Sequence, residues 1–144
     1  MSNLEKLMNY LEVSTQTLQQ LRTSSKNAHI ASRDTAWDYY VAWRDSAEGK
    51  AWKQQKEVEY GYRCPECNRK TPLTIDHKIP RSKAPWLAWD LSNLWLLCYH
   101  CNKKKGDKNW SEYLNTIKEK RGNVVYKRIL KLAQLSKKDQ QNSR

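Results

Sequence analysis

Residues 64–102 read CPECNRKTPLTIDHKIPRSKAPWLAWDLSNLWLLCYHCN, and this stretch decides the fold. It holds all four cysteines of the chain as two C-x-x-C pairs, Cys64/Cys67 and Cys98/Cys101. A C-x-x-C turn can aim two thiolates at one ion, and two such turns supply the four ligands of tetrahedral zinc. Two disulfides would imply an oxidising compartment, and a redox C-x-x-C would not explain two copies. The pattern favours a structural zinc site.

The segments between and after the cysteine pairs predict a small α+β unit. Residues 73–75 are a short apolar and β-branched run and residues 94–97 are a second such run, which is typical of strands. The intervening segment contains Pro80 and Pro85, which suits a long loop, and residues 99–105 predict a short helix ending at Gly106. Two strands and one short helix bury too little surface to be stable alone, so zinc binding would supply folding free energy.

A second set of polar residues is not explained by the zinc site. Asp76 and His77 lie between the cysteine pairs, Asn93 precedes the second apolar run, and Asn102 directly follows the last cysteine. Taken singly, Asp76 suits a turn cap and His77 suits a buried, hydrogen-bonded histidine. Histidine is also the natural general base near neutral pH, and carboxylate and amide oxygens are hard ligands for Mg²⁺ or Mn²⁺. Their joint placement around the cysteines favours a catalytic site.

These spaced elements together resemble the HNH endonucleases, also called His-Asn-His or ββα-metal nucleases. The resemblance covers about a third of the chain, roughly residues 64–108. It rests on Asp76-His77 with Pro80, on Asn93-Leu94, and on Cys98-x-x-Cys101-Asn102 followed by Lys105-Gly106. The third position of the family motif is His or Asn, and here it is Asn102.

The resemblance implies an α+β fold with a ββα-metal core, braced by the four-cysteine zinc site and flanked by N- and C-terminal helices. It implies a DNA endonuclease that uses a one-metal mechanism. His77 would act as the general base, and Asp76 and Asn102 would hold a catalytic Mg²⁺ or Mn²⁺. Asn93 would orient the base through the backbone of the loop.

The charge distribution agrees with a nucleic-acid partner. The net charge is +12, and residues 1–63 contribute little of it, with nine Lys/Arg against eight Asp/Glu. The excess lies in residues 64–144, around and after the motif. A run of charges is usually a solvated helix face, but this one adjoins the predicted metal ligand Asn102. We therefore expect DNA contacts from Arg81, Lys83, Lys103, Lys104, Lys105 and Lys108.

The flanking segments read as helical. We expect a helical N-terminal extension over residues 1–59, the nuclease core over 60–110, and basic C-terminal helices with a tail over 111–144. Residues 4–22 resemble a helix-turn-helix weakly, and a plain amphipathic helix that packs on the core is the favoured interpretation. Residues 32–59 predict a helical region that Gly49 interrupts, and Ser111 and Asn123 are expected to cap helices running to 121 and 135.

Two other classes of protein share some of these features. A non-catalytic zinc-ribbon module that binds nucleic acid would carry the same cysteines and charge, but it gives no reason for Asp76-His77 and Asn102. A zinc-knuckle adaptor for protein partners does not require the +12 charge. The longest apolar run has six residues, too short to span a membrane, and the N-terminus lacks an export signal. We therefore expect a cytoplasmic protein without a membrane partner; no feature specifies an oligomeric state.

Overall fold

The structure is a computed structural model that describes residues 2–6, 8 and 26–134. The chain divides into two compact units, residues 1–35 and 36–144, and the side chains discussed below lie in the second. Most of the expected helix-turn-helix at 4–22 lies outside the described residues. Among the helices of the described ranges, none is long and apolar enough to cross a membrane.

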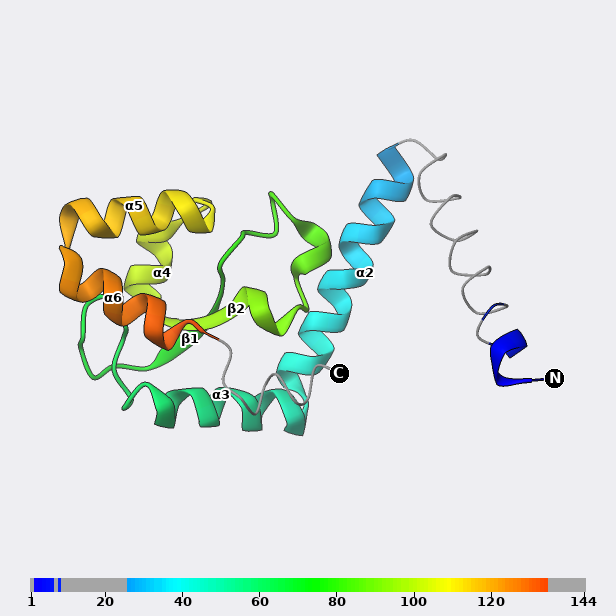
Figure 1. Cartoon of the computed structure of the whole chain (residues 1–144), viewed down its shortest axis with the longest axis horizontal. Helices are drawn as coiled ribbons and strands as arrows, with labels where there is room; N and C mark the ends of the chain where they lie inside the picture. Colours follow the sequence, from blue (N-terminus) through cyan, green and yellow to red (C-terminus); the bar gives the residue numbers. More distant parts are fainter. Residues whose placement is uncertain (1, 7, 9–25, 135–144) are drawn as a thin grey trace. The chain divides into compact units, whose positions relative to one another are not determined.

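A two-stranded antiparallel hairpin followed directly by a helix forms the centre of the second unit (Figure 1). Strand β1 is Leu73–His77, β2 is Leu94–Cys98, and α4 is Tyr99–Lys105. The predicted strands and helix are therefore confirmed, and the fold class is α+β. The register pairs Leu73 with Cys98 and His77 with Leu94. The two C-x-x-C turns consequently lie at one end of the hairpin, and His77 lies at the other.

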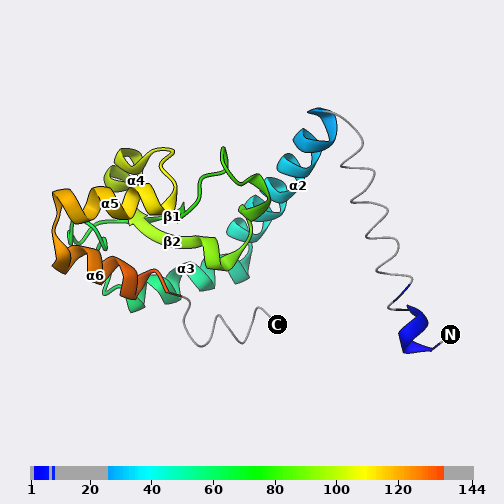
Figure 2. The same ribbon diagram turned by 45° about the horizontal axis from the view of Figure 1, so that its top comes forward.

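Helices cover both faces of the hairpin. Helix α3, Ala47–Glu59, lies on one side, and α4 and α5, Trp110–Lys120, lie on the other (Figures 1 and 2). Every residue of β2 is buried, which is why its sequence is continuously apolar rather than alternating. Trp95 is fully buried, with its ring centroid 5.1 Å from that of Trp110 and 5.8 Å from that of Tyr113. Aromatic packing thus fixes α5 onto the strand that precedes the last cysteine pair.

The sequence predicted a helix break at Gly49, but the two helices before the hairpin are separated at Ser46. Helix α2 is Lys26–Asp45, and Ser46 caps α3 by accepting a hydrogen bond from the Gly49 amide at 3.1 Å. Gly49 lies inside the first turn of α3, where a Cβ atom would come within 2.0 Å of the Trp43 carbonyl oxygen. The glycine therefore permits close packing of the two helices and does not end either of them.

The C-terminal helices begin at slightly different residues from those predicted. The side chain of Asn109, not Ser111, caps α5 by accepting from the Glu112 amide at 2.9 Å. Helix α6 spans Asn123–Leu132 and follows Gly122, whose φ of 86° favours glycine. Residue 135, where the sequence predicted the end of this helix, lies outside the described residues.

The long loop between the strands contains two short 3-10 turns, η1 at Pro85–Leu87 and η2 at Leu91–Asn93.

Candidate active site and metal centres

The four cysteine sulfurs form a compact cluster. All four lie within 4.8 Å of one another, and the sulfurs of Cys67 and Cys98 are 3.8 Å apart. A tetrahedral ion with bonds of about 2.3 Å to sulfur separates its ligands by about 3.8 Å. The geometry and the all-thiol donor set therefore fit zinc, as the C-x-x-C spacing predicted.

The backbone of each cysteine pair forms a hydrogen-bonded turn. The Cys101 amide donates to Cys98 Sγ at 3.4 Å, and the Asn68 amide donates to the Cys64 carbonyl at 2.9 Å. Burial raises the pKa of the Cys64 thiol to about 11. Binding of a divalent cation would deprotonate such a thiol, so metal affinity should be coupled to proton release.

Glu66, inside the first cysteine pair, connects the zinc site to the C-terminal helices. Its carboxylate accepts hydrogen bonds from Tyr113 Oη at 2.8 Å and from Arg121 at 3.0 Å. Arg128 of α6 donates to the carbonyls of Pro65 and Glu66 at 2.8 and 3.1 Å. Arg121 and Arg128 of the basic C-terminal segment therefore bind the first cysteine turn. Their position in a positively charged tail did not indicate this role.

Asp76 is buried on the face of β1 that packs against α4. Its Oδ2 accepts a hydrogen bond from Trp95 Nε1 at 2.7 Å and lies 3.2 Å from the ammonium of Lys105. Burial raises the pKa of the carboxyl above its ordinary value, and the Lys105 charge and the indole N–H oppose that rise. Because Oδ2 makes both contacts, Oδ1 is the oxygen left for a cation.

Lys105 does not occupy the place that the sequence predicted for it. Its side chain is 1% exposed, and its ammonium donates to the His77 carbonyl at 2.8 Å besides pairing with Asp76. It is therefore an internal counter-charge to Asp76 and not a surface contact for phosphate. The available signal was helical spacing, because Lys105 follows buried Cys101 by four residues and so shares its face of α4.

The His77 ring lies on the opposite face of β1, among aromatic side chains of α2. Its ring centroid is 4.6 Å from that of Tyr40 and 5.9 Å from that of Trp37. Its Nε2 lies 2.8 Å from the Ala88 carbonyl oxygen, which is in the loop after η1. Sequence reasoning did not connect α2 to this site. The only local signal was that positions 37 and 40 share one helical face.

These contacts define the chemical state of the His77 imidazole. A carbonyl can only accept, so Nε2 carries the hydrogen, and the lone pair of the neutral ring is on Nδ1. Burial lowers the pKa of His77 below its ordinary value, and the hydrogen bond to Ala88 partly offsets this effect. The imidazole is thus held in one orientation and is neutral near pH 7.

Asn93 joins the two ends of the loop between the strands. Its Oδ1 accepts from the Ile79 amide at 2.8 Å, and its Nδ2 donates to the carbonyls of Ile79 and Leu87 at 3.1 and 3.2 Å. Its own carbonyl accepts from the Lys78 amide at 2.7 Å. These bonds fix the backbone on both sides of the segment that contacts His77.

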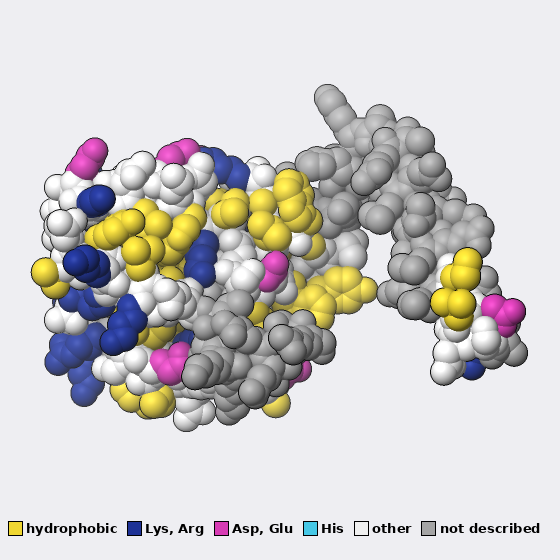
Figure 3. Space-filling model, in the orientation of Figure 1, with side chains coloured by type: hydrophobic (Ala, Val, Ile, Leu, Met, Phe, Trp, Pro, Cys, Tyr) yellow, Lys and Arg dark blue, Asp and Glu magenta, His cyan; other side chains and the backbone are white. Residues whose placement is uncertain are grey.

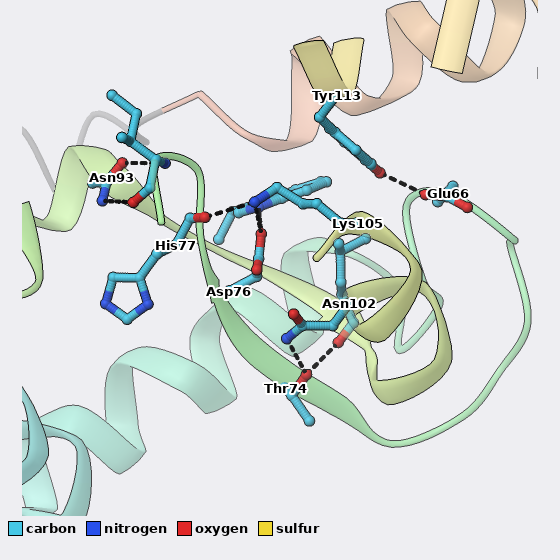
Figure 4. A network of polar contacts seen from close by, with 11 residues as sticks. Glu66, Thr74, Asp76, His77, Asn93, Asn102, Lys105 and Tyr113 are labelled. Carbon is cyan, nitrogen blue, oxygen red and sulfur yellow. Dashed lines mark hydrogen bonds and ion pairs between the residues drawn. The ribbon is translucent and has the colours of Figure 1, made fainter. Parts of the chain in front are cut away.

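Asn102 shares the α4-facing side of β1 with Asp76. Its Nδ2 donates to Thr74 Oγ1 at 3.2 Å, which leaves its amide oxygen available to a cation. Thr74 and Asp76 are two residues apart in β1 and therefore lie on one face. Figure 4 shows that the His77 imidazole points away from both Asp76 and Asn102. The hairpin therefore brings the two predicted metal ligands, Asp76 and Asn102, to one face. The predicted base, His77, is the last residue of β1 and points to the opposite face.

The remaining residues predicted to contact DNA have different environments. Lys103 and Lys104 are exposed on α4, and Lys83 forms an exposed ion pair with Glu112 at 3.5 Å. The Arg81 guanidinium lies 4.3 Å from the ring centroid of Trp37. Figure 3 shows further Lys and Arg side chains on the end of the molecule that carries α5 and α6. A pocket of about 280 Å³ beside α4 and α5 is lined by Glu66, Lys104, Lys105, Lys108, Tyr113, Thr116, Ile117, Lys120 and Arg121.

Comparison with protein families matches residues 64–108 to a family described as HNH endonuclease. This match confirms the resemblance and covers the same residues. It supports a nuclease or another function involving nucleic acid. Neither the curated proteins nor the solved structures gave a significant match.

Proposed function

We propose that this protein is a metal-dependent DNA endonuclease in which His77 is the general base. The observation that carries the proposal is the hydrogen bond from His77 Nε2 to the Ala88 carbonyl at 2.8 Å, within a segment that matches the HNH endonuclease family. A general base must be unprotonated and correctly oriented. The hydrogen bond from Nε2 to Ala88 fixes the imidazole and leaves Nδ1 free to accept a proton. The lowered pKa of His77 keeps that atom unprotonated near pH 7.

The reaction is hydrolysis of one phosphodiester bond. Nδ1 of His77 takes a proton from water while the water oxygen attacks phosphorus, and the bond from phosphorus to the 3′ oxygen breaks. The leaving oxygen then takes a proton from solvent. Asn93 is a positioning residue, because it fixes the loop backbone that holds Ala88.

Asp76 and Asn102 are the residues that would hold the catalytic ion. Their available oxygens are hard ligands that suit Mg²⁺ or Mn²⁺, with water and phosphate completing the coordination. Such an ion, when bound, stabilises charge on the phosphate and on the leaving oxygen. The scissile phosphate would lie across the end of β1, between the Asp76 face and the His77 face.

The test is cleavage of supercoiled plasmid by zinc-loaded protein, with and without Mg²⁺ or Mn²⁺. Wild-type protein should produce nicked or linear plasmid only with the added ion. His77→Ala should lose activity by about 10²–10⁴-fold while zinc content and DNA affinity stay near wild type. Asn102→Ala should be inactive through lost metal binding. Asp76→Ala should also be inactive, but it removes the counter-charge of the buried Lys105 as well as a metal ligand, so its folding is measured beside its activity. Equal cleavage by wild type and His77→Ala would refute the assignment.

A non-catalytic nucleic-acid-binding module is the second candidate, and one observation favours it. The Asp76 carboxylate is already paired with the buried Lys105 ammonium at 3.2 Å, which lowers its attraction for a cation. This candidate predicts DNA binding by all the variants and no cleavage under any metal condition. The plasmid assay therefore separates the two.

A further inference from the structure

Three large aromatic side chains are exposed beside the site. Trp86, Trp89 and Tyr39 are 62%, 47% and 57% exposed, and together they are called the aromatic surface below. The five other tryptophans of the chain are buried or half-buried. Trp86 lies within η1, and Trp89 lies two residues beyond its end. The Tyr39 and Trp89 rings are stacked, with centroids 5.6 Å apart and an angle of 21° between their planes.

The aromatic surface adjoins His77 through both of the elements that carry it. Trp89 directly follows Ala88, whose carbonyl contacts His77 Nε2 at 2.8 Å. Tyr39 directly precedes Tyr40, whose ring centroid is 4.6 Å from that of His77. The two segments that carry the aromatic surface therefore also supply contacts of the proposed base. Figure 3 shows hydrophobic side chains gathered over this part of the molecule.

The neighbouring charges favour nucleic acid over an apolar protein partner. Two arginines lie over α2 rings that neighbour Tyr39 in sequence: Arg81 over the half-buried Trp37 at 4.3 Å, and Arg44 over the buried Tyr40 at 5.8 Å. Arg44 also pairs with Asp45 at 2.9 Å. Exposed aromatic faces interleaved with cationic groups are the arrangement that binds single strands, since bases stack on the rings while cations meet phosphates. In a duplex, base faces are covered by their neighbours, so rings of this kind need unpaired bases.

We propose that Tyr39, Trp86 and Trp89 bind unpaired nucleobases next to the scissile phosphate. The preferred substrate is therefore DNA with a single-stranded segment, such as a flap, a gap or a loop, and not a fully paired duplex. This substrate class rests on the proposed nuclease function, whereas the binding of unpaired bases does not.

Binding can be tested without cleavage by using zinc-loaded protein with no added Mg²⁺ or Mn²⁺. The probes are a single-stranded oligonucleotide carrying 2-aminopurine and the same sequence in a blunt duplex. Wild-type protein should bind the single strand more tightly and quench its fluorescence by stacking. Trp86→Ala and Trp89→Ala should each weaken this binding by about ten-fold or more, while duplex binding changes little. Tyr99→Ala is the matched control, because Tyr99 is 69% exposed on α4, away from the aromatic surface.

The outcomes separate this inference from the proposed function. Unchanged single-strand affinity and quenching in both tryptophan variants would overturn the inference, even if the protein cleaves plasmid. Tighter binding to the blunt duplex would also overturn it, as would a wild-type dimer in sedimentation that dissociates in the tryptophan variants. Selective single-strand binding by a protein that never cleaves DNA would leave the inference standing and refute the nuclease assignment.

Discussion

Replacing Lys105 by Met should strongly destabilise the protein, because it leaves a buried carboxylate without its counter-charge. The Lys105 side chain is 1% exposed and the Asp76 side chain 8%, with 3.2 Å between ammonium and carboxylate. The same ammonium donates to the His77 carbonyl at 2.8 Å. Removing one partner of a buried ion pair typically costs about 3–5 kcal/mol. We therefore expect Lys105→Met to lower the free energy of unfolding by at least about 3 kcal/mol.

The assay is urea unfolding at saturating zinc, so that metal loss does not contribute to the measured difference. Lys104→Met is the matched control, because Lys104 is exposed on the same helix. The double variant Asp76→Asn/Lys105→Met should lose less free energy of unfolding than the sum of the losses in the two single variants, because it removes both charges together. We expect a coupling energy of about 2 kcal/mol or more.

Two results would refute this reasoning. The first is a Lys105→Met cost no larger than that of the exposed control. The second is simple additivity in the double variant, which would mean that the two charges do not depend on each other. Either result would also remove the main observation in favour of the non-catalytic candidate, because Asp76 would then need no internal cation.

Further variants test the metal centres and the DNA contacts. Cys98→Ser should reduce zinc below one ion per chain and lower stability sharply, as measured by elemental analysis and thermal unfolding; full zinc content would contradict the four-cysteine assignment. Asn93→Ala should slow cleavage less than His77→Ala does, since it acts only through the loop; an equal loss in both would assign Asn93 a direct role. Neutralising Lys103 and Lys104 together should weaken DNA binding on every sequence and flatten its salt dependence, and an unchanged slope would place the phosphate contacts elsewhere.

The sequence predicted the centre of the fold well because local patterns determine it. The strands, the short helix and the four-cysteine cluster each depend on residues close together in the chain or on a fixed ligand spacing. The register then follows from the metal cluster, since Cys98 must lie near the first cysteine pair. The helix break at Ser46 also rests on local contacts, namely the hydrogen bond from the Gly49 amide to Ser46 and the close approach of Gly49 to Trp43. The prediction misplaced this break because it treats Gly49 as a helix breaker and does not consider Ser46 as a cap.

Long-range partners account for what the sequence did not reveal about the site. The rings of Trp37 and Tyr40 meet His77 only because α2 packs against the hairpin. Lys105 looked like one of three surface lysines, yet helical geometry turns it inward while Lys103 and Lys104 stay exposed. Charge counting could not separate these roles, because a basic run has the same composition whether its members face solvent or a buried carboxylate.

Helix α4 links the zinc centre to the candidate catalytic face. It has seven residues, too few for a helix to be stable by its own hydrogen bonds. Cys101 anchors its first turn through the four-sulfur cluster, and Lys105 anchors its last turn through Asp76 and the His77 carbonyl. Asn102 lies between these anchors, so its position depends on both. In the proposed mechanism, zinc would therefore affect catalysis only indirectly. Without zinc, α4 would lose one of its two anchors, and with it the position of Asn102 relative to Asp76.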